Sequence, residues 1–235
     1  MLYGFPTLRI LRERPGQFVE PGSDARVRRA LSLVPRHLFL DERWREQAYA
    51  DTPLPVGPEA TISAPHMVAL QLEWALLSPG LKVLEVGSGC GYLLALLDLL
   101  VVPGGKVRGV EFERELAERS ERTLRSIAPG REVRVRIGDG EEGWPQEGPF
   151  DRIVVSYAVR GALPAALAHQ LVEGGYLIVP WGEGELTYLE RLCRRGEGLR
   201  RDLRGPPCLF VPSKSRQGRP PSSDQPQKYH NLKYH

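Results

Sequence analysis

The stretch Val83-Leu84-Glu85-Val86-Gly87-Ser88-Gly89-Cys90-Gly91-Tyr92 decides the fold of this chain. Its first part is rich in β-branched residues, as strands are, and it ends in three glycines spaced one residue apart. An apolar helical pattern begins directly after the glycines, at Leu93. Glycines between a strand and a helix let backbone N–H groups approach a ligand closely and leave the helix N-terminus uncovered. The stretch therefore predicts a nucleotide-like cofactor site in an α/β sheet.

From Lys82 onward, expected strands alternate with expected helices of about ten to fifteen residues. The strands are predicted at 82–86, 106–111, 132–137, 152–156 and 176–180, and the helices at 92–101, 113–127 and 163–171. This alternation predicts an α/β fold with a Rossmann-like, mostly parallel sheet and helices on both faces. Two further strands, at 186–194 and 207–211, are expected to form an antiparallel hairpin at the C-terminal edge, joined by a Gly/Arg-rich connection.

The residues before this alternation follow a different pattern. Helices are expected at 24–33, with Asp24 as N-cap, and at 66–77, and a loop rich in turn formers is expected at 52–58. Ser63 is expected to cap the second helix, with Pro65 in its first turn. We expect three parts: an N-terminal helical and loop extension at 1–80 on the acceptor side of the cleft, a cofactor-binding core at 81–212, and a flexible tail at 213–235.

Composition limits the possible classes of protein. The net charge of +3 over 235 residues is too small to indicate a nucleic-acid binder. Three cysteines, an odd number without CxxC spacing, argue against a disulfide framework or a metal site and favour a reducing cytoplasm. The longest apolar stretch, 92–102, is interrupted by Asp98 and is too short to span a bilayer. We expect a cytoplasmic protein that acts as a monomer, away from membranes.

Three acidic residues fall at strand ends, where ligands bind in an open α/β sheet. Glu85 lies just before the glycines, Glu111 ends the second strand, and Asp139 follows the third. A carboxylate at the end of the second strand can accept both ribose hydroxyls, and an Asp139-Gly140 turn can reach an adenine amine. Taken alone, each residue favours the simpler interpretation, Glu111 as an acid at a helix start and Asp139-Gly140 as a simple turn. Together they favour a cofactor site.

The glycine spacing separates two classes of cofactor. A dinucleotide fingerprint is GxGxxG, whereas this chain has Gly87-x-Gly89-x-Gly91 with Glu85 before it. Carboxylates facing the loop repel a diphosphate but attract the ammonium and sulfonium groups of S-adenosylmethionine. The pattern therefore predicts a class I methyltransferase fold.

The segment Ala60-Thr61-Ile62-Ser63-Ala64-Pro65-His66-Met67 resembles the N-terminal signature of protein-L-isoaspartate O-methyltransferases. The segments 34–39 and 48–57 resemble it too, and so do the core segments 138–144, 149–155 and 171–180. The resemblance implies methyl transfer from S-adenosylmethionine to the α-carboxyl of L-isoaspartyl residues in damaged proteins and peptides, with S-adenosylhomocysteine as product. Cyclisation of the ester to a succinimide then allows return to aspartate.

The resemblance also implies roles for particular residues. Ser63 takes the place of the active-site serine. The residues implied in cofactor binding are Glu85, Gly87, Ser88, Gly89, Gly91, Glu111, Phe112, Asp139 and Gly140. Those implied on the acceptor side are Ala60, Thr61, Ile62, His66, Ser156 and Tyr157.

The implied reaction needs alignment rather than a general base, because an α-carboxylate with a pKa of about 3.5 is already ionised at neutral pH. Ser63 can donate one hydrogen bond to that carboxylate, and none of the five histidines lies in a sequence pattern typical of a base. For His66, a structural hydrogen bond at the helix start is the alternative to acceptor contact.

The chain departs from the family pattern after the fourth strand. Tyr157 and Arg160 occupy a run, Ser156-Tyr157-Ala158-Val159-Arg160, where the family has small residues of the Ala-Ala-Ala-Pro type. Arg160 is interpreted as solvated, with pairing to an acceptor carboxylate as the alternative. The departure leaves two alternatives open: a methyltransferase for another carboxylate or small molecule, and a non-catalytic cofactor-binding protein.

Overall fold

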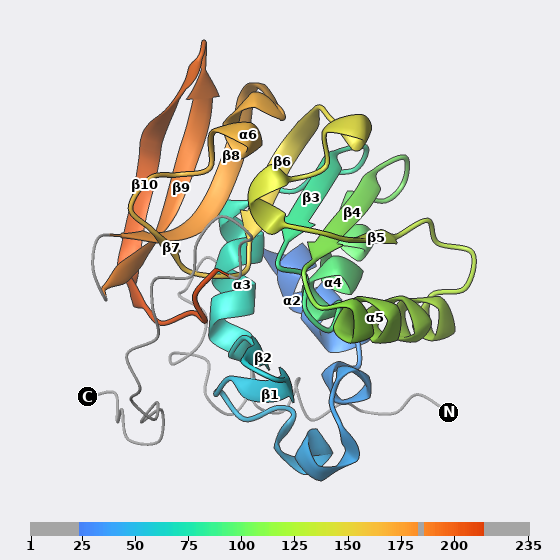
Figure 1. Ribbon diagram of the computed structural model, residues 1–235. Coiled ribbons are helices and arrows are strands. Elements are labelled where there is room, and N and C mark those ends of the chain that lie inside the picture. The colour runs from blue at the N-terminus through green and yellow to red at the C-terminus, as the bar shows by residue number, and fades with distance from the viewer. Residues whose placement is uncertain (1–23, 183–185, 214–235) are drawn as a thin grey trace.

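A central eight-stranded sheet organises the computed structural model, which describes residues 24–182 and 186–213 (Figure 1). The strand order is β10-β9-β8-β6-β3-β4-β5, and β7 pairs with β8. The strands are β3 Lys82–Val86, β4 Lys106–Glu111, β5 Arg134–Ile137, β6 Phe150–Val155, β7 Val159–Arg160, β8 Leu171–Gly182, β9 Thr187–Arg195 and β10 Gly198–Cys208. Strands β3 to β8 pair in parallel, whereas β9 and β10 pair antiparallel at one edge. The mostly parallel sheet and its antiparallel edge are confirmed.

Helices cover both faces of the sheet, as predicted. Because successive strand residues point to opposite faces, Val154 of β6 packs under the helices α3, α4 and α5, backed by α2, while Ile153 and Val155 pack on the side of α6. All three residues are fully buried. The helices are α2 Ala25–Leu33, α3 Pro65–Trp74, α4 Tyr92–Val101, α5 Arg114–Ile127 and α6 Ala165–His169, with the 3-10 turns η1 Arg36–Phe39, η2 Glu42–Gln47, η3 Gly140–Glu142 and η4 Pro145–Glu147.

Several predicted boundaries were wrong, and the strand expected at 176–180 in fact runs over Leu171–Gly182. The connection expected before residue 207 is largely strand, because β10 begins at Gly198 and pairs with β9 along its length. The helix expected at 163–171 is shorter, because Leu171 already pairs with Phe150 in the sheet. Helix α3 ends at Trp74, and Leu76 has a φ of 47°, a left-handed conformation that cannot continue a helix.

The N-terminal extension contains a small hairpin where only a loop was expected. Strand β1, Leu54–Gly57, pairs antiparallel with β2, Ala60–Ile62. Arg119 of α5 holds this region by an ion pair with Asp41 at 2.7 Å and a hydrogen bond to the Val56 carbonyl. The β1–β2 hairpin and the turns η1 and η2 lie at the bottom of the view in Figure 1, below the sheet, whereas α2 and α3 pack with α4 on a face of the sheet.

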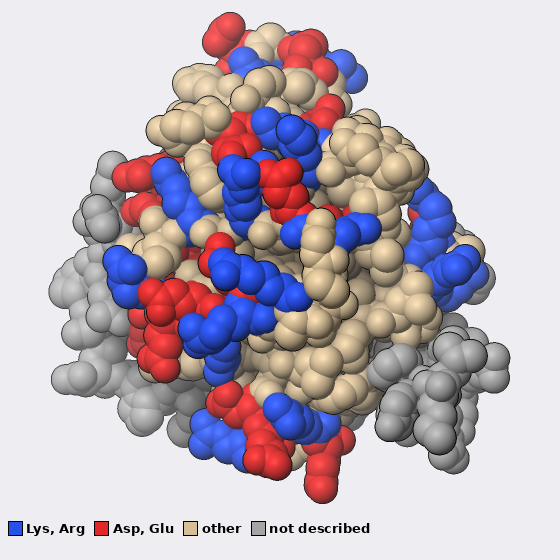
Figure 2. All heavy atoms as spheres, turned by 90° about the vertical axis from the view of Figure 1, so that its right-hand side faces the viewer, with Lys and Arg blue, Asp and Glu red and all other residues tan. Residues whose placement is uncertain are grey.

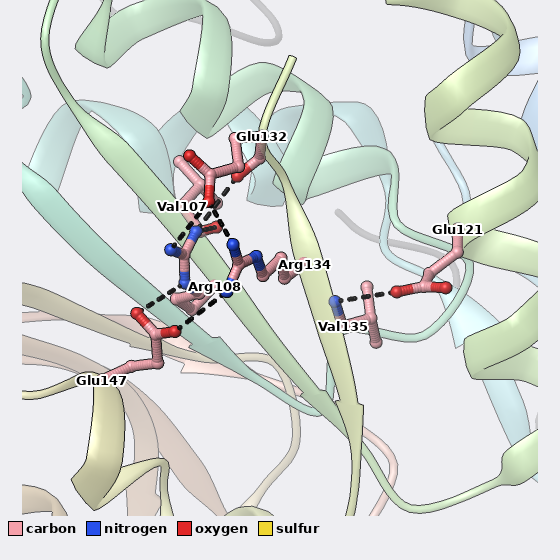
Figure 3. Close-up of polar contacts among 7 residues, drawn as sticks. All are labelled: Val107, Arg108, Glu121, Glu132, Arg134, Val135 and Glu147. Atoms are coloured by element: carbon pink, nitrogen blue, oxygen red, sulfur yellow. Dashed lines mark hydrogen bonds and ion pairs between the residues drawn. The ribbon is translucent and has the colours of Figure 1, made fainter. Parts of the chain in front are cut away.

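Ion pairs fix the other edge of the sheet, at β4 and β5. The buried Arg108 guanidinium lies 2.9 Å from the Glu147 carboxylate, and Arg134 pairs with both Glu147 and Glu132 (Figure 3). Basic and acidic side chains interleave over the face near α5 and β5 rather than gathering by sign (Figure 2). Within the described ranges, no helix has the length and apolar character that crossing a bilayer requires. The predicted tail lies outside the described residues from position 214 onward.

Candidate active site

The glycine loop joins β3 to α4 in the way its sequence predicts. Gly87, Gly89 and Gly91 have φ values of 73°, 54° and 86°, and Gly91 is the N-cap residue of α4. A Cβ atom at Gly87 would lie 2.7 Å from Tyr157 Cδ1, and one at Gly91 would lie 3.0 Å from Ser120 Cβ. Glycine is therefore required at both positions by backbone conformation and by close approach. Ser88, also implied in cofactor binding, is buried, and its N–H donates to the Val110 carbonyl.

Glu111 closes the glycine loop from the end of β4. Its Oε2 accepts the Gly89 N–H at 2.7 Å, and its Oε1 accepts the Glu113 N–H, at the start of α5, at 3.0 Å. The side chain is mostly buried, with the residue 7% exposed. An ionised carboxylate has about four lone-pair sites, so these two contacts leave capacity for hydroxyl donors. The helix-start role and the cofactor role coexist in this geometry.

Asp139 lies one strand further along, after β5. Its Oδ1 accepts the Glu141 N–H at 2.9 Å and caps η3, which Gly140 begins. Because Glu111 pairs with Ile137 in the register of β4 and β5, the two acidic positions lie at the same edge of the sheet. Phe112 and Ile137 are each 37% exposed there and offer an apolar wall. Ile137 is a candidate that the sequence reasoning missed, because only the strand register brings it beside Glu111.

Glu85 is the most deeply buried acid of the site, at 2% exposure. Its Oε1 accepts the Ser156 hydroxyl at 2.7 Å, whereas Oε2 has no hydrogen-bond partner among the described residues. Burial raises the pKa of Glu85 well above its ordinary value; the Ser156 hydrogen bond opposes this shift, and the nearby Glu111 charge adds to it. A buried carboxyl with one unpaired oxygen fits a ligand that brings a cationic group.

The predicted acceptor residues follow one another through β2 into α3. Ala60 is half-buried, Thr61 is exposed and Ile62 packs in the hydrophobic core. Ser63 is half-buried, but it does not cap α3. The N-cap residue is Ala64, because Pro65 occupies the first helical position, and the predicted capping role of Ser63 was wrong. The Ser63 hydroxyl is therefore not committed to the helix end.

His66 has a carboxylate partner that the sequence did not reveal. Asp51 Oδ1 accepts the His66 backbone N–H at 3.0 Å, and the Asp51 carboxylate lies 2.8 Å from His66 Nδ1. The His66 side chain is 32% exposed. His66 therefore makes the structural hydrogen bond at the helix start that was the alternative to acceptor contact, and the sequence did not predict its partner Asp51. The only signal in the sequence is that Asp51 falls in the segment 48–57, which resembles the family signature.

The loop after β6 touches both the glycine loop and the Asp139 turn. Ser156 binds Glu85, as described above, and Tyr157 packs against Gly87 and Gly140. Arg160 is exposed, which agrees with its interpretation as solvated. The structure thus brings Ser156 and Tyr157 to the residues implied in cofactor binding.

Comparison with known proteins identifies the family. A family model described as protein-L-isoaspartate(D-aspartate) O-methyltransferase matches residues 17–218. The chain belongs to the protein-L-isoaspartate O-methyltransferase family. A protein-L-isoaspartate O-methyltransferase of Hyperthermus butylicus is 42% identical over 193 residues, covering 79% of this chain and 80% of its own. Another, of Gloeobacter violaceus, is 48% identical over 183 residues, covering 78% of this chain and 87% of its own.

Solved structures agree with the membership in the protein-L-isoaspartate O-methyltransferase family. One from Plasmodium falciparum, described as a protein-L-isoaspartate O-methyltransferase in complex with S-adenosyl-L-homocysteine, has a TM-score of 0.75 at 27% identity. The match covers 88% of this chain and 96% of that chain. The class I methyltransferase fold is therefore confirmed.

Proposed function

We propose that this chain transfers a methyl group from S-adenosylmethionine to the α-carboxyl of L-isoaspartyl residues in damaged proteins and peptides. The observation that carries the proposal is the placement of Glu111 and Asp139 at the ends of adjacent strands, around a glycine loop backed by the buried Glu85. Membership in the protein-L-isoaspartate O-methyltransferase family supports the choice of acceptor.

The residues present fit the cofactor. Its ammonium and sulfonium charges suit Glu85, whose second carboxyl oxygen has no partner in the described part of the chain. Glu111 would hold the ribose hydroxyls, Asp139 with Gly140 the adenine amine, and Phe112 the adenine face. Gly87, Ser88, Gly89 and Gly91 would form the cradle. When bound, the cofactor supplies an electrophilic methyl group on its sulfonium sulfur.

The acceptor side has to orient an anion rather than remove a proton. An α-carboxylate is ionised at neutral pH, so catalysis rests on holding one of its oxygens in line with the methyl group. Ser63 would donate a hydrogen bond to this carboxylate, and Ala60, Thr61 and His66 would line the acceptor path. Asp51 fixes the His66 ring through Nδ1, so that its other edge keeps one orientation.

We further propose that the enzyme works as a monomer in the cytoplasm, without binding nucleic acid or membranes. Cys90, Cys193 and Cys208 are buried free thiols, which supports a reducing compartment. The interleaved charges on the face in Figure 2 offer no region of one sign for a polyanion there. Light scattering after size exclusion tests the oligomeric state, and a mass near twice the 26.3 kDa of the chain would contradict it.

The function is tested by incubating the protein with methyl-labelled S-adenosylmethionine and an isoaspartyl peptide, beside the aspartyl peptide of the same sequence. We expect base-labile label on the isoaspartyl peptide alone, and a large loss of the rate with Ser63→Ala at unchanged cofactor affinity. Label on an unrelated carboxylate but on neither peptide would indicate a different acceptor. Cofactor binding with no transfer to any carboxylate would show a non-catalytic protein.

A further inference from the structure

One side chain touches two of the loops assigned to the cofactor. A Cβ atom built on Gly87 would lie 2.7 Å from Tyr157 Cδ1, and one built on Gly140 would lie 3.0 Å from Tyr157 Cε1 and 3.1 Å from its hydroxyl oxygen. Gly87 follows β3 and Gly140 follows β5, two strands that β4 separates in the sheet. Tyr157 itself follows β6, on the opposite side of β3. Its ring therefore reaches across the sheet end and contacts both loops.

The residues on either side of Tyr157 are held in place. Ser156 donates its hydroxyl to Glu85 at 2.7 Å. The Ala158 N–H donates to the Val211 carbonyl at 2.8 Å, and the Ser213 N–H donates to the Ala158 carbonyl. Ser213 also donates its hydroxyl to Glu141 Oε1 at 3.0 Å, next to the Asp139–Gly140 turn. Because hydrogen bonds hold the residues on both sides of Tyr157, its ring has little freedom to move away from the two loops.

The Tyr157 side chain is deeply buried, with the residue 7% exposed. Its hydroxyl makes no well-formed hydrogen bond among the described residues, and Ser213 is the polar side chain near it. Burial, with the charges of Glu141 and Asp139, raises the pKa of this phenol above its ordinary value, and the nearby Ser213 side chain opposes the shift, so the group stays neutral and keeps its donor proton. A buried donor without a well-formed hydrogen bond is unfavourable in itself. What the residue contributes to the ligand-free protein is therefore the packing of its ring.

We propose that Tyr157 is a positioning residue for the cofactor. Its ring holds the glycine loop and the Asp139–Gly140 turn at the separation that cofactor binding requires, and it acts through Gly87 and Gly140. This inference rests on the proposed function, because it takes the two loops to be the cofactor site. It differs from the acceptor role that the resemblance implied for Tyr157, and it concerns a position where this chain departs from the family pattern.

A double-mutant cycle tests the proposal. S-adenosylhomocysteine affinity is measured by calorimetry for wild type, Tyr157→Ala, Gly140→Ala and the double variant. Tyr157→Ala should weaken binding by about tenfold or more, because both loops lose their support. Gly140→Ala should also weaken it, since its Cβ would press on the ring. In the Tyr157→Ala background that pressure is gone, so adding Gly140→Ala should cost less than about twofold.

Two controls keep the test decisive. Leu192→Ala removes a buried side chain from the same hydrophobic cluster, on β9, and should lower stability without changing cofactor affinity. Tyr157→Phe keeps the ring and should bind the cofactor within about twofold of wild type, even if Tyr157→Ala fails to fold. Additive effects in the cycle would overturn the proposal, as would wild-type affinity in a folded Tyr157→Ala or an equal loss in Leu192→Ala.

The experiment is independent of the acceptor. Affinity for S-adenosylhomocysteine is measured without peptide, whereas the proposed function is tested by transfer to the isoaspartyl peptide in the wild-type protein. A negative result in the affinity measurement therefore does not affect the transfer assay, and a negative transfer assay does not affect the affinity measurement. A rise in the peptide KM of Tyr157→Phe with unchanged cofactor affinity would instead place Tyr157 on the acceptor side and contradict the proposal.

Discussion

Replacing Glu111 by glutamine exchanges one acceptor oxygen for an NH2 donor and so removes one of the two backbone hydrogen bonds that the side chain accepts. In the structure, each carboxylate oxygen accepts a backbone N–H, from Gly89 at 2.7 Å and from Glu113 at 3.0 Å. An amide has one acceptor oxygen and one NH2 donor, so in either orientation of the glutamine a donor faces a backbone donor. Loss of one hydrogen bond to a charged group costs about 1.5–3 kcal/mol. For a chain of this size that predicts a Tm lower by roughly 3–12 °C.

The same substitution is expected to weaken cofactor binding. The proposed ribose contacts use the carboxylate as a double acceptor, and an amide can supply only one oxygen. The loss of one charged hydrogen bond corresponds to an increase in the S-adenosylhomocysteine Kd of about 10- to 100-fold. The peptide KM should not change, since Glu111 lies on the cofactor side.

Calorimetric titration and a thermal melt measure both effects on the same protein. Glu115→Gln is the matched control, because Glu115 is an exposed acid in the first turn of α5. It should leave the Tm and the Kd close to wild type. Wild-type affinity in a folded Glu111→Gln protein would refute the assignment of Glu111 to the ribose.

Three further substitutions test other parts of the site. Burial raises the pKa of Glu85 in the folded, ligand-free protein. The contribution of Glu85 to the free energy of unfolding is therefore greatest below its unfolded pKa and is lost as pH rises through its folded pKa. Binding of the cationic cofactor should ionise Glu85 and release a proton, which calorimetry in buffers of different ionisation enthalpy measures. Glu85→Gln should abolish this proton release. An equal release by wild type and Glu85→Gln would contradict the assignment of Glu85. Asp51→Asn weakens the contact with His66 and should raise the peptide KM several-fold at unchanged cofactor affinity. The control Asp41→Asn loses only partly exposed ion pairs with Arg119 and Arg43 and should leave the peptide KM unchanged. A changed cofactor Kd instead of KM would argue against an acceptor role for His66. Gly91→Ala forces a φ of 86° on a residue with a Cβ atom and should lower the free energy of unfolding by about 1–3 kcal/mol, measured by urea titration. An unchanged midpoint of the urea titration would contradict this strain and show that the loop relaxes.

The interior strands could be predicted because they are buried on both faces. The β-branched pattern of Val83 and Val86, followed by the glycines, places β3 and α4 where the structure has them. Strand β10 could not be delimited in this way. It lies at the edge of the sheet and exposes Arg201 and Arg204, whose charges pair with the buried Glu190 of β9. A solvent-facing edge strand of this composition has the pattern of a loop.

The site residues likewise fall into those that the sequence could predict and those that it could not. Glu85, Glu111 and Asp139 could be found because the carboxyl ends of parallel strands meet at one sheet edge. The pair of Asp51 and His66 could not, because the β1–β2 hairpin lies between them and brings two residues 15 positions apart into contact. Neither Asp51 nor His66 by itself indicates in the sequence that the chain folds back through this hairpin.

The sequence indicates that Tyr157 is unusual at its position but does not reveal its contacts. Its size is unusual at a position where small residues were expected, but its contacts depend on strand order. Only the placement of β6 next to β3 brings the ring to Gly87 and Gly140. An added Cβ atom would clash with the ring at Gly87 and press on it at Gly140, so the three positions are coupled by packing.

The most direct test of the account compares kcat/KM for methyl transfer to an isoaspartyl peptide and to its aspartyl twin, which differ only in which carboxyl is free. We predict base-labile methyl ester on the isoaspartyl peptide, formed at a rate that Ser63→Ala sharply reduces, and no transfer above background to the aspartyl twin. Equal transfer to both peptides, or none to either by protein that binds S-adenosylmethionine, would contradict it.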